Sequence, residues 1–356
     1  MSIRAYPFGS TADGQTVTAY EITAENGMRA EILDLGCIIN RLFVPDRAGN
    51  VSDIVLGCDT AEDTQKSPYF GAVIGRYGNR IAKGQFTLDD QSYQLHCNDG
   101  INHLHGGDCG FNQKKWKVDD YDPAGSSLSF SYISVDGEEN YPGTVDMQVT
   151  YGLGDSALTI LYHATTDAPT ILNLTNHSYF NLAGHDSGAI GEQSIQLFAA
   201  NVALVDDTMI PTGEALPVAE TAFDFTSSRT IADAMKAGEN DPRINTPSCR
   251  GGFDHNFFLD KSVGLGLVGE AFDPASGRVM TVISDQPCVQ FYTANFLGDA
   301  NVKGKDGAVY ANHSAYCLET QHAPDSPHHP EWPSTVLRPG AEYDSVTIYR
   351  FSTRDN

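Results

Sequence analysis

Alternation of apolar and polar residues with a period of two is the dominant pattern along the chain. In 146–153, Met147, Val149, Tyr151 and Leu153 alternate with polar residues or glycine. A period of two is typical of strands that bury one face in an antiparallel sheet. The same pattern predicts further strands at 127–134, 157–164, 278–284, 288–296 and 345–351. We therefore expect an all-β protein with a large antiparallel sheet.

Helical periodicity is rare in this sequence. The spacing of Ile231 and Met235 predicts a helix over 228–237, and a short helical turn is expected near 60–66. No internal repeat, low-complexity tract or linker-like boundary interrupts the strand pattern. We expect a single domain over 1–356, and the pattern leaves open whether it is a sandwich or a barrel.

The charge balance narrows the class of ligand. The chain of 356 residues carries 46 acidic and 22 basic residues, which gives a formal net charge of -24. Nucleic acids and anionic membrane surfaces would be repelled, so we expect neither as a partner. A phosphorylated ligand would need a cluster of lysines and arginines, and the sequence shows no obvious one. A neutral small molecule is the favoured ligand.

Cysteine usage and the absence of an apolar segment predict a soluble cytoplasmic protein. The cysteines are odd in number, widely scattered and without a CxxC pair: Cys37, Cys58, Cys97, Cys109, Cys249, Cys288 and Cys317. We interpret them as reduced thiols. The first residues lack the apolar core of a secretory signal, and no stretch approaches the roughly 18 to 20 apolar residues of a membrane span. A monomer or a homodimer is expected.

The segment 171–182 has two faces of opposite character if it is extended. One face is apolar, and the other presents a row of hydrogen-bonding groups: Asn173, Thr175, His177, Tyr179 and Asn181. The polar row could hold a polyhydroxylated ligand. The alternatives are a buried polar ladder that satisfies neighbouring strands, or an ordinary exposed face.

Two further predicted strands place polar residues among apolar ones. In 288–296, Gln290 and Tyr292 share a face, and in 315–322, Glu319 and Gln321 share a face. A glutamate between alternating apolar residues is expensive to bury unless it has a partner or a function. The alternative is a glutamate on a solvent-facing strand.

Two histidines and two Gly-rich turns are weaker candidates. His103 and His105 form an HxH pair that could bind a metal, but no further ligand stands at a recognisable spacing, so we predict no metal site. A histidine can equally act as an acid-base group. Segment 75–86 holds Arg76, Asn79 and Arg80, and segment 251–260 holds Asp254; either could be an ordinary turn.

Taken together, these segments resemble the aldose 1-epimerases, the galactose mutarotase family. The resemblance rests on six motifs in family order and spacing: GRYGNR (75–80), NHLHGG (102–107), TNHSYFNL (175–182), FDHNF (253–257), VQFYTANF (289–296) and ETQHAPDSP (319–327). It extends from about residue 28 to 350. The resemblance implies an antiparallel β-sandwich of the galactose-mutarotase type, with a sugar groove across one sheet.

The resemblance also implies an activity and residue roles. The family interconverts the α and β anomers of free aldoses such as galactose or glucose by acid-base ring opening, without a metal or organic cofactor. By this resemblance Glu319 is the base, His177 is the acid, and His105 forms a hydrogen bond near the C1 hydroxyl or the ring oxygen. The matching sugar-binding positions are Arg76, Asn79, Asp254 and Gln290.

Three alternatives stay open on the sequence. A glycoside hydrolase could use Glu319 and Asp254 as a carboxylate pair, although that mechanism does not need His177 or His105. A mutarotase-like protein could bind sugar without catalysis, because a fold does not guarantee its activity. A hexose-6-phosphate 1-epimerase is the third alternative, disfavoured by the acidic balance.

Overall fold

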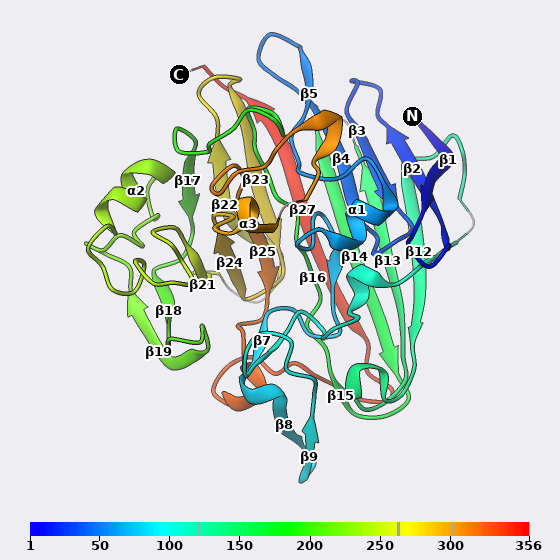
Figure 1. The fold of residues 1–356 in the computed structure, drawn as a ribbon, viewed down its shortest axis with the longest axis vertical. Helices are drawn as coiled ribbons and strands as arrows, with labels where there is room; N and C mark the ends of the chain where they lie inside the picture. The colour runs from blue at the N-terminus through cyan, green and yellow to red at the C-terminus, as the bar shows by residue number, and fades with distance from the viewer. Residues whose placement is uncertain (120, 155, 262–263, 301, 356) are drawn as a thin grey trace.

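A large antiparallel sheet forms one layer of the molecule (Figure 1). The computed structural model describes residues 1–119, 121–154, 156–261, 264–300 and 302–355. The nine strands of this sheet, in spatial order, are β11 (Lys117–Val118), β12 (Ser127–Ser134), β13 (Val145–Leu153), β14 (Ala157–Thr166), β27 (Tyr343–Thr353), β23 (Arg278–Ser284), β22 (Gly266–Phe272), β17 (Ser194–Leu197) and β20 (Arg229–Thr230). The last strand along the chain, β27, therefore lies in the interior of the sheet.

Two five-stranded antiparallel sheets accompany the large one. The first contains the N-terminal strands in sequence order: β1 (Ser2–Ser10), β2 (Thr16–Thr23), β3 (Arg29–Leu33), β4 (Ile39–Pro45) and β5 (Val51–Asp53). The second has the order β19 (Pro211–Pro217), β18 (Asn201–Val205), β21 (Asp254–Phe258), β24 (Cys288–Tyr292) and β25 (Cys317–Gln321). The three motifs nearest the C-terminus thus place residues on three neighbouring strands.

Short elements complete the described part of the chain. Four two-stranded pairs are β7 (Arg80–Ile81) with β10 (His103–Leu104), β6 (Val73–Ile74) with β16 (Thr175–Asn176), β15 (Thr170–Ile171) with β26 (Val336–Leu337), and β8 (Gln85–Leu88) with β9 (Gln91–Gln94). The helices are α1 (Ala61–Lys66), α2 (Ile231–Ala237) and α3 (Leu297–Ala300). Among the described residues, no helix is long and apolar enough to cross a membrane.

The predicted long strands are confirmed, and two of their boundaries or those of the helices differ by three residues or more. β24 ends at Tyr292 rather than at 296, because Thr293 and Asn295 turn their side chains back to the backbone oxygen of Phe253. The second helix begins at Ile231 rather than at 228, because Thr230 caps it by accepting a hydrogen bond from the backbone of Asp233.

The largest core cluster joins the sheets into a sandwich. Side chains alternate between the two faces of a strand, so β13 buries Val145, Met147, Val149 and Tyr151 toward this core. Phe257, Val289, Phe291 and Leu318 of the second five-stranded sheet belong to the same cluster. The cluster contains residues from Ile3 to Phe351. This supports the single domain over 1–356, which stays a prediction.

The segment 171–182 differs from the expected two-faced strand. Only Thr175–Asn176 and Thr170–Ile171 pair as short strands in this region, and residues of both alternating sets are buried. Asn173 donates to the backbone oxygens of Gly78 and His322, and Asn181 donates to those of Gly188 and Ser314. These amides satisfy irregular backbone, as in the buried-ladder alternative, so the row does not form one sugar-binding face.

Candidate active site

A cleft of about 360 Å³ collects residues from distant parts of the chain. Its lining residues are Pro68, Tyr69, Asn79, Arg80, Asp99, Leu104, His105, His177, Tyr179, Ser248, Asp254, Tyr292, Phe296 and Glu319. Five of the seven predicted site residues are therefore brought together: Glu319, His177, His105, Asn79 and Asp254. The other two, Arg76 and Gln290, are not among the lining residues.

Three neighbouring strands place the carboxylates. Gln290 of β24 is paired directly with Glu319 of β25, and Asp254 of β21 is paired with Tyr292. Side chains of residues that face each other across antiparallel strands lie on the same side of the sheet. Gln290 Nε2 donates to Asp254 Oδ1 at 2.7 Å. Gln290 therefore fixes the carboxylate of Asp254, which lines the cleft.

Glu319 is a buried carboxyl group whose charged form is disfavoured. Its exposed fraction is 2%, and Oε2 has no hydrogen-bond partner among the described residues. Burial raises its pKa well above the usual value, the negative charge of Asp254 raises it further, and the positive charge of Arg80 opposes both effects. A carboxylate of this kind is a strong base.

His177 lies next to this carboxyl group. Its Nε2 is 3.6 Å from Glu319 Oε1, and its exposed fraction is 4%. The imidazole is stacked with Tyr179 at 4.9 Å between ring centroids and with Tyr69 at 5.8 Å. Burial lowers the pKa of His177 to about 4, so its protonated form is a strong acid. Base and acid are therefore adjacent.

His105 has a fixed protonation pattern. The backbone N–H of Asn79 donates to His105 Nδ1 at 3.1 Å, so Nδ1 is the acceptor and the neutral ring carries its proton on Nε2. Burial lowers the pKa of His105 well below its usual value, and the charges of His177 and Arg80 lower it further. His105 can therefore act as a neutral hydrogen-bond donor, and its predicted hydrogen bond near the C1 hydroxyl or the ring oxygen stays a prediction.

Arg80 supplies the positive charge of the cleft. Its Nε donates to Asp99 Oδ2 at 2.8 Å, and its Nη1 lies 3.7 Å from Asp254 Oδ2. Asp325, from the C-terminal part of the chain, holds the backbone of β7, the strand that begins with Arg80. Asp325 donates its backbone N–H to the oxygen of Arg80 and accepts one from Ala82 with its carboxylate. The motif that starts at Glu319 thus also positions Arg80.

The prediction that Arg76 contacts the ligand does not agree with its position. Arg76 is 2% exposed, and its guanidinium donates to Ser134 Oγ and to the backbone oxygens of Ser134, Val135 and Pro142. These bonds hold it under the loop after β12. The motif GRYGNR contains two arginines, and the structure brings the second, Arg80, to the cleft.

A pair of substitutions separates the two arginines. Arg80→Ala should raise KM for the substrate at least about tenfold, because a charge-assisted hydrogen bond is worth about 1.5–3 kcal/mol. Arg76→Ala leaves four acceptors, two of them in buried hydrogen bonds, without their donor, so it should lower the unfolding midpoint while KM changes less than about twofold in the folded fraction. Steady-state kinetics and thermal unfolding of both variants measure this. The reverse pattern would return the binding role to Arg76.

The HxH pair does not act as a unit. His103 is bonded through Nδ1 to the backbone oxygen of His96 and through Nε2 to the hydroxyl of Tyr141, whereas His105 faces the cleft. A different set could hold a divalent cation: one ligand atom each from His105, His177 and Glu319 lie within 4.8 Å of one another. The effect of metal removal on activity therefore distinguishes a metal site from an acid-base site at these three residues.

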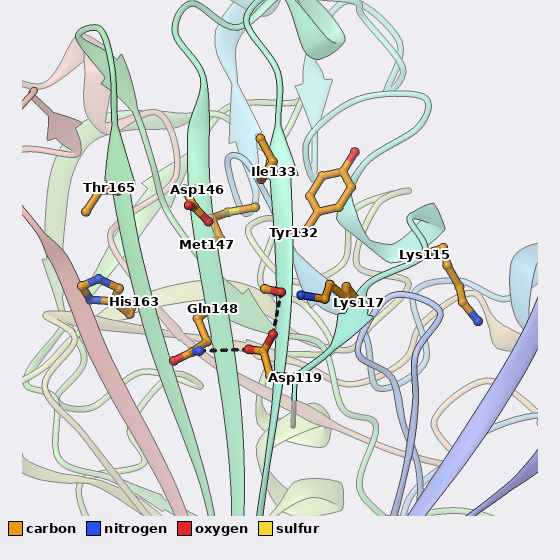
Figure 2. A pocket seen from close by; sticks show the side chains of 11 residues that line it. Lys115, Lys117, Asp119, Tyr132, Ile133, Asp146, Met147, Gln148, His163 and Thr165 are labelled. Atoms are coloured by element: carbon orange, nitrogen blue, oxygen red, sulfur yellow. Dashed lines mark hydrogen bonds between the residues drawn. The ribbon is translucent and has the colours of Figure 1, made fainter. Parts of the chain in front are cut away.

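A second, larger hollow of about 660 Å³ lies on the outer face of the nine-stranded sheet (Figure 2). It is lined by residues of β11 to β14 and by Lys115 and Asp119 on either side of β11, and none of them belongs to the cleft. Its acceptor Asp119 already receives hydrogen bonds from Ser131 and Gln148, drawn as dashed lines in Figure 2. This surface has no buried acid-base pair, so the smaller cleft is the candidate active site.

Comparison with known proteins identifies the family to which this chain belongs. Residues 18–350 match the family model for aldose 1-epimerase. The chain belongs to the aldose 1-epimerase family. It is therefore an isomerase. It is 45% identical over 340 residues to galactose mutarotase from Homo sapiens, which covers 95% of this chain and 95% of the relative. It is 35% identical over 344 residues to aldose 1-epimerase from Escherichia coli, covering 95% and 96%.

Solved structures of aldose 1-epimerases confirm the predicted fold class. The crystal structure of an aldose epimerase homologue from C. elegans superposes with a TM-score of 0.85 at 31% identity, covering 94% of this chain and 98% of the other. That of galactose 1-epimerase from Lactobacillus acidophilus has a TM-score of 0.85 at 23% identity, covering 99% of each chain. The all-β, galactose-mutarotase-type sandwich is thus correct.

Several residues of the aldose 1-epimerase cleft were not predicted as site residues. Arg80 adjoins Asn79 in the same motif. The motif therefore indicated that an arginine contacts the ligand, but not which of its two arginines does so. Tyr69 carries no such signal: it adopts a left-handed backbone conformation after α1 and lays its ring 4.7 Å from His105. Asp99 and Ser248 come from loops that only the fold brings to the cleft.

Proposed function

We propose that this aldose 1-epimerase interconverts the α and β anomers of free aldoses such as galactose or glucose, with Glu319 as base and His177 as acid. The observation that carries the proposal is the buried pair of Glu319 Oε1 and His177 Nε2, 3.6 Å apart in a cleft lined with polar groups. A carboxylate and an imidazolium on either side of an anomeric centre are the two groups that ring opening requires.

The reaction starts from the charged pair, which holds the same number of protons as the neutral pair favoured by burial and forms from it when the carboxyl proton of Glu319 passes to His177 Nε2. Glu319 takes the proton from the C1 hydroxyl, and the electron pair of the broken O–H bond forms the π bond of the C1 carbonyl. The bond from C1 to the ring oxygen breaks, its electron pair stays on that oxygen, and His177 Nε2 protonates it. Rotation about C1–C2 presents the other face of the aldehyde. Closure reverses both proton transfers, so the enzyme returns to its starting state without a net change in protons.

Burial favours the ring-opening step. The same environment raises the pKa of Glu319 and lowers that of His177, so the carboxylate is a stronger base and the imidazolium a stronger acid than either group would be in water. Opening converts an ion pair into a neutral pair, and a dry site disfavours the ion pair. His105 Nε2–H can stabilise negative charge that develops on a sugar oxygen, without itself giving up a proton.

Binding and specificity follow from the remaining polar groups. We assign Asp254, held by Gln290, and the pair of Asn79 and Arg80 to the hydroxyls of the sugar, because carboxylate and guanidinium groups form strong hydrogen bonds to them. Arg80 is the one Lys or Arg among the lining residues, and it is already flanked by Asp99 and Asp254. This favours a neutral sugar over a hexose phosphate.

The proposal also includes the cellular location and the oligomeric state of the enzyme. The seven cysteines are free, five of them buried, which is compatible with the reducing cytoplasm predicted from the sequence. A monomer or a homodimer is retained as the expected state.

Polarimetry tests the proposed function directly. Freshly dissolved α-D-galactose and α-D-glucose should reach the same final rotation faster with the protein than without it, and an exhaustively EDTA-treated sample should retain this rate. Loss of activity with EDTA and recovery with zinc would assign a metal to His105, His177 and Glu319. No acceleration of either sugar would contradict the proposed substrate class.

A further inference from the structure

The second nitrogen of His177 has a neighbour that the proposed reaction does not use. Cys317 Sγ lies 3.4 Å from His177 Nδ1, within hydrogen-bonding distance for sulfur. Cys317 is 0% exposed and begins β25, two residues before Glu319. The strand that carries the base therefore also provides a partner for the acid.

The two ring nitrogens of His177 thus face different groups. Nε2 is turned toward Glu319 Oε1, and Nδ1 is turned toward the thiol. In the proposed cycle Nε2 gives its proton to the ring oxygen and later recovers it. The neutral ring that remains must then carry its proton on Nδ1, because a neutral imidazole holds one proton.

We propose that Cys317 is a positioning residue that keeps His177 in the Nδ1–H tautomer, with Nδ1–H donating to Sγ and Nε2 left as the nitrogen that exchanges protons. The inference rests on the proposed role of His177 as acid. The arrangement is the opposite of that at His105, where the Asn79 amide fixes the proton on Nε2. The two cleft histidines are thereby assigned different tautomers, one to transfer a proton and one to donate a hydrogen bond.

The chemistry of sulfur suits this position. A carboxylate hydrogen-bonded to Nδ1–H would orient the ring but would also stabilise the imidazolium, which weakens it as an acid. A thiol is a weak and neutral acceptor, so it orients the ring with little gain in basicity. Burial raises the pKa of Cys317 well above its usual value, which keeps the group a neutral thiol beside the imidazole.

Nitrogen NMR measures the tautomer without any substrate. In protein labelled with ¹⁵N-histidine, the His177 signals, assigned by their loss in His177→Asn, should show a protonated Nδ1 and an unprotonated Nε2 at neutral pH. A protonated Nε2 together with an unprotonated Nδ1 in the wild-type protein would overturn the inference, because the thiol would then be the donor. This result leaves the mutarotase proposal standing, since polarimetry tests that proposal separately.

Substitutions connect the tautomer to the rate. Cys317→Ala should shift part of His177 to the Nε2–H tautomer and lower kcat at least about tenfold, with KM within about twofold. Cys317→Ser restores an acceptor, so it should recover the Nδ1–H tautomer and most of kcat. A folded Cys317→Ala variant with unchanged tautomer and unchanged kcat would contradict the proposal.

A matched control removes a buried thiol elsewhere. Cys288 is a buried, free cysteine on the neighbouring strand β24. Its partner in the register with β25 is Gln321, and the contact with His177 is made by Cys317. Cys288→Ala should create a comparable cavity while leaving the His177 tautomer unchanged. An equal shift of the tautomer in both variants would mean that general loosening of the sheet, and not the Cys317 contact, moves the proton, and would overturn the inference.

Discussion

Replacing Glu319 by glutamine should lower kcat about a thousandfold while KM stays within about threefold. Glutamine keeps the shape of the side chain and can still form hydrogen bonds, but it cannot accept the proton of the C1 hydroxyl. The charged form of Glu319 is disfavoured by burial, so the neutral amide should leave the unfolding midpoint unchanged or raise it. Polarimetry and thermal unfolding of the same preparation measure both effects.

A glutamate outside the cleft provides the matched control. Glu138 accepts hydrogen bonds from Tyr132 and Ser134 and forms an ion pair with Lys114. Glu138→Gln should therefore lower the unfolding midpoint and leave kcat nearly unchanged. Near-normal kcat in a folded Glu319→Gln variant would exclude Glu319 as the base.

Replacing His177 by asparagine should lower kcat about a hundredfold or more, because the amide cannot deliver a proton to the ring oxygen. Asparagine also loses the stacking against Tyr69 and Tyr179, so some loss of stability is expected. Initial rates of mutarotation at saturating sugar separate the two effects, provided that the folded fraction is determined by thermal unfolding.

His105→Asn is the control for this second prediction. If His105 acts as a neutral donor, asparagine preserves a donor and the loss in kcat should be at least tenfold smaller than for His177→Asn. Equal losses would mean that His105 also transfers a proton. A smaller loss for His177→Asn than for His105→Asn would exchange the two roles.

The long strands and the fold class were predictable because their signal is local. In β13, every second residue from Val145 to Leu153 is buried, so periodicity alone identifies the strand and its inner face. The same reasoning failed at 171–182. Its alternation is real, but Asn173 and Asn181 bond to irregular backbone that the sequence does not reveal.

The site was predictable where a motif contains one candidate of each kind. Glu319 and His177 were identified in this way, and the structure places them side by side. The prediction that Arg76 lines the cleft was wrong, because Arg80 does so instead. The two arginines lie four residues apart in one motif, and only the path of the backbone decides which side chain reaches the cleft. Tyr69 could not be predicted, since its place over both histidines depends on a single left-handed residue after α1.

The interior position of β27 has a consequence for synthesis of this enzyme. β27 pairs with β14 on one side and with β23 on the other, so the large sheet stays divided until Tyr343–Thr353 have emerged from the ribosome. Before that, both neighbours present unpaired backbone edges, which favour pairing with other chains. A nascent chain should therefore gain protease resistance only after this strand has emerged, and messages truncated before this strand should yield aggregates rather than partly active enzyme.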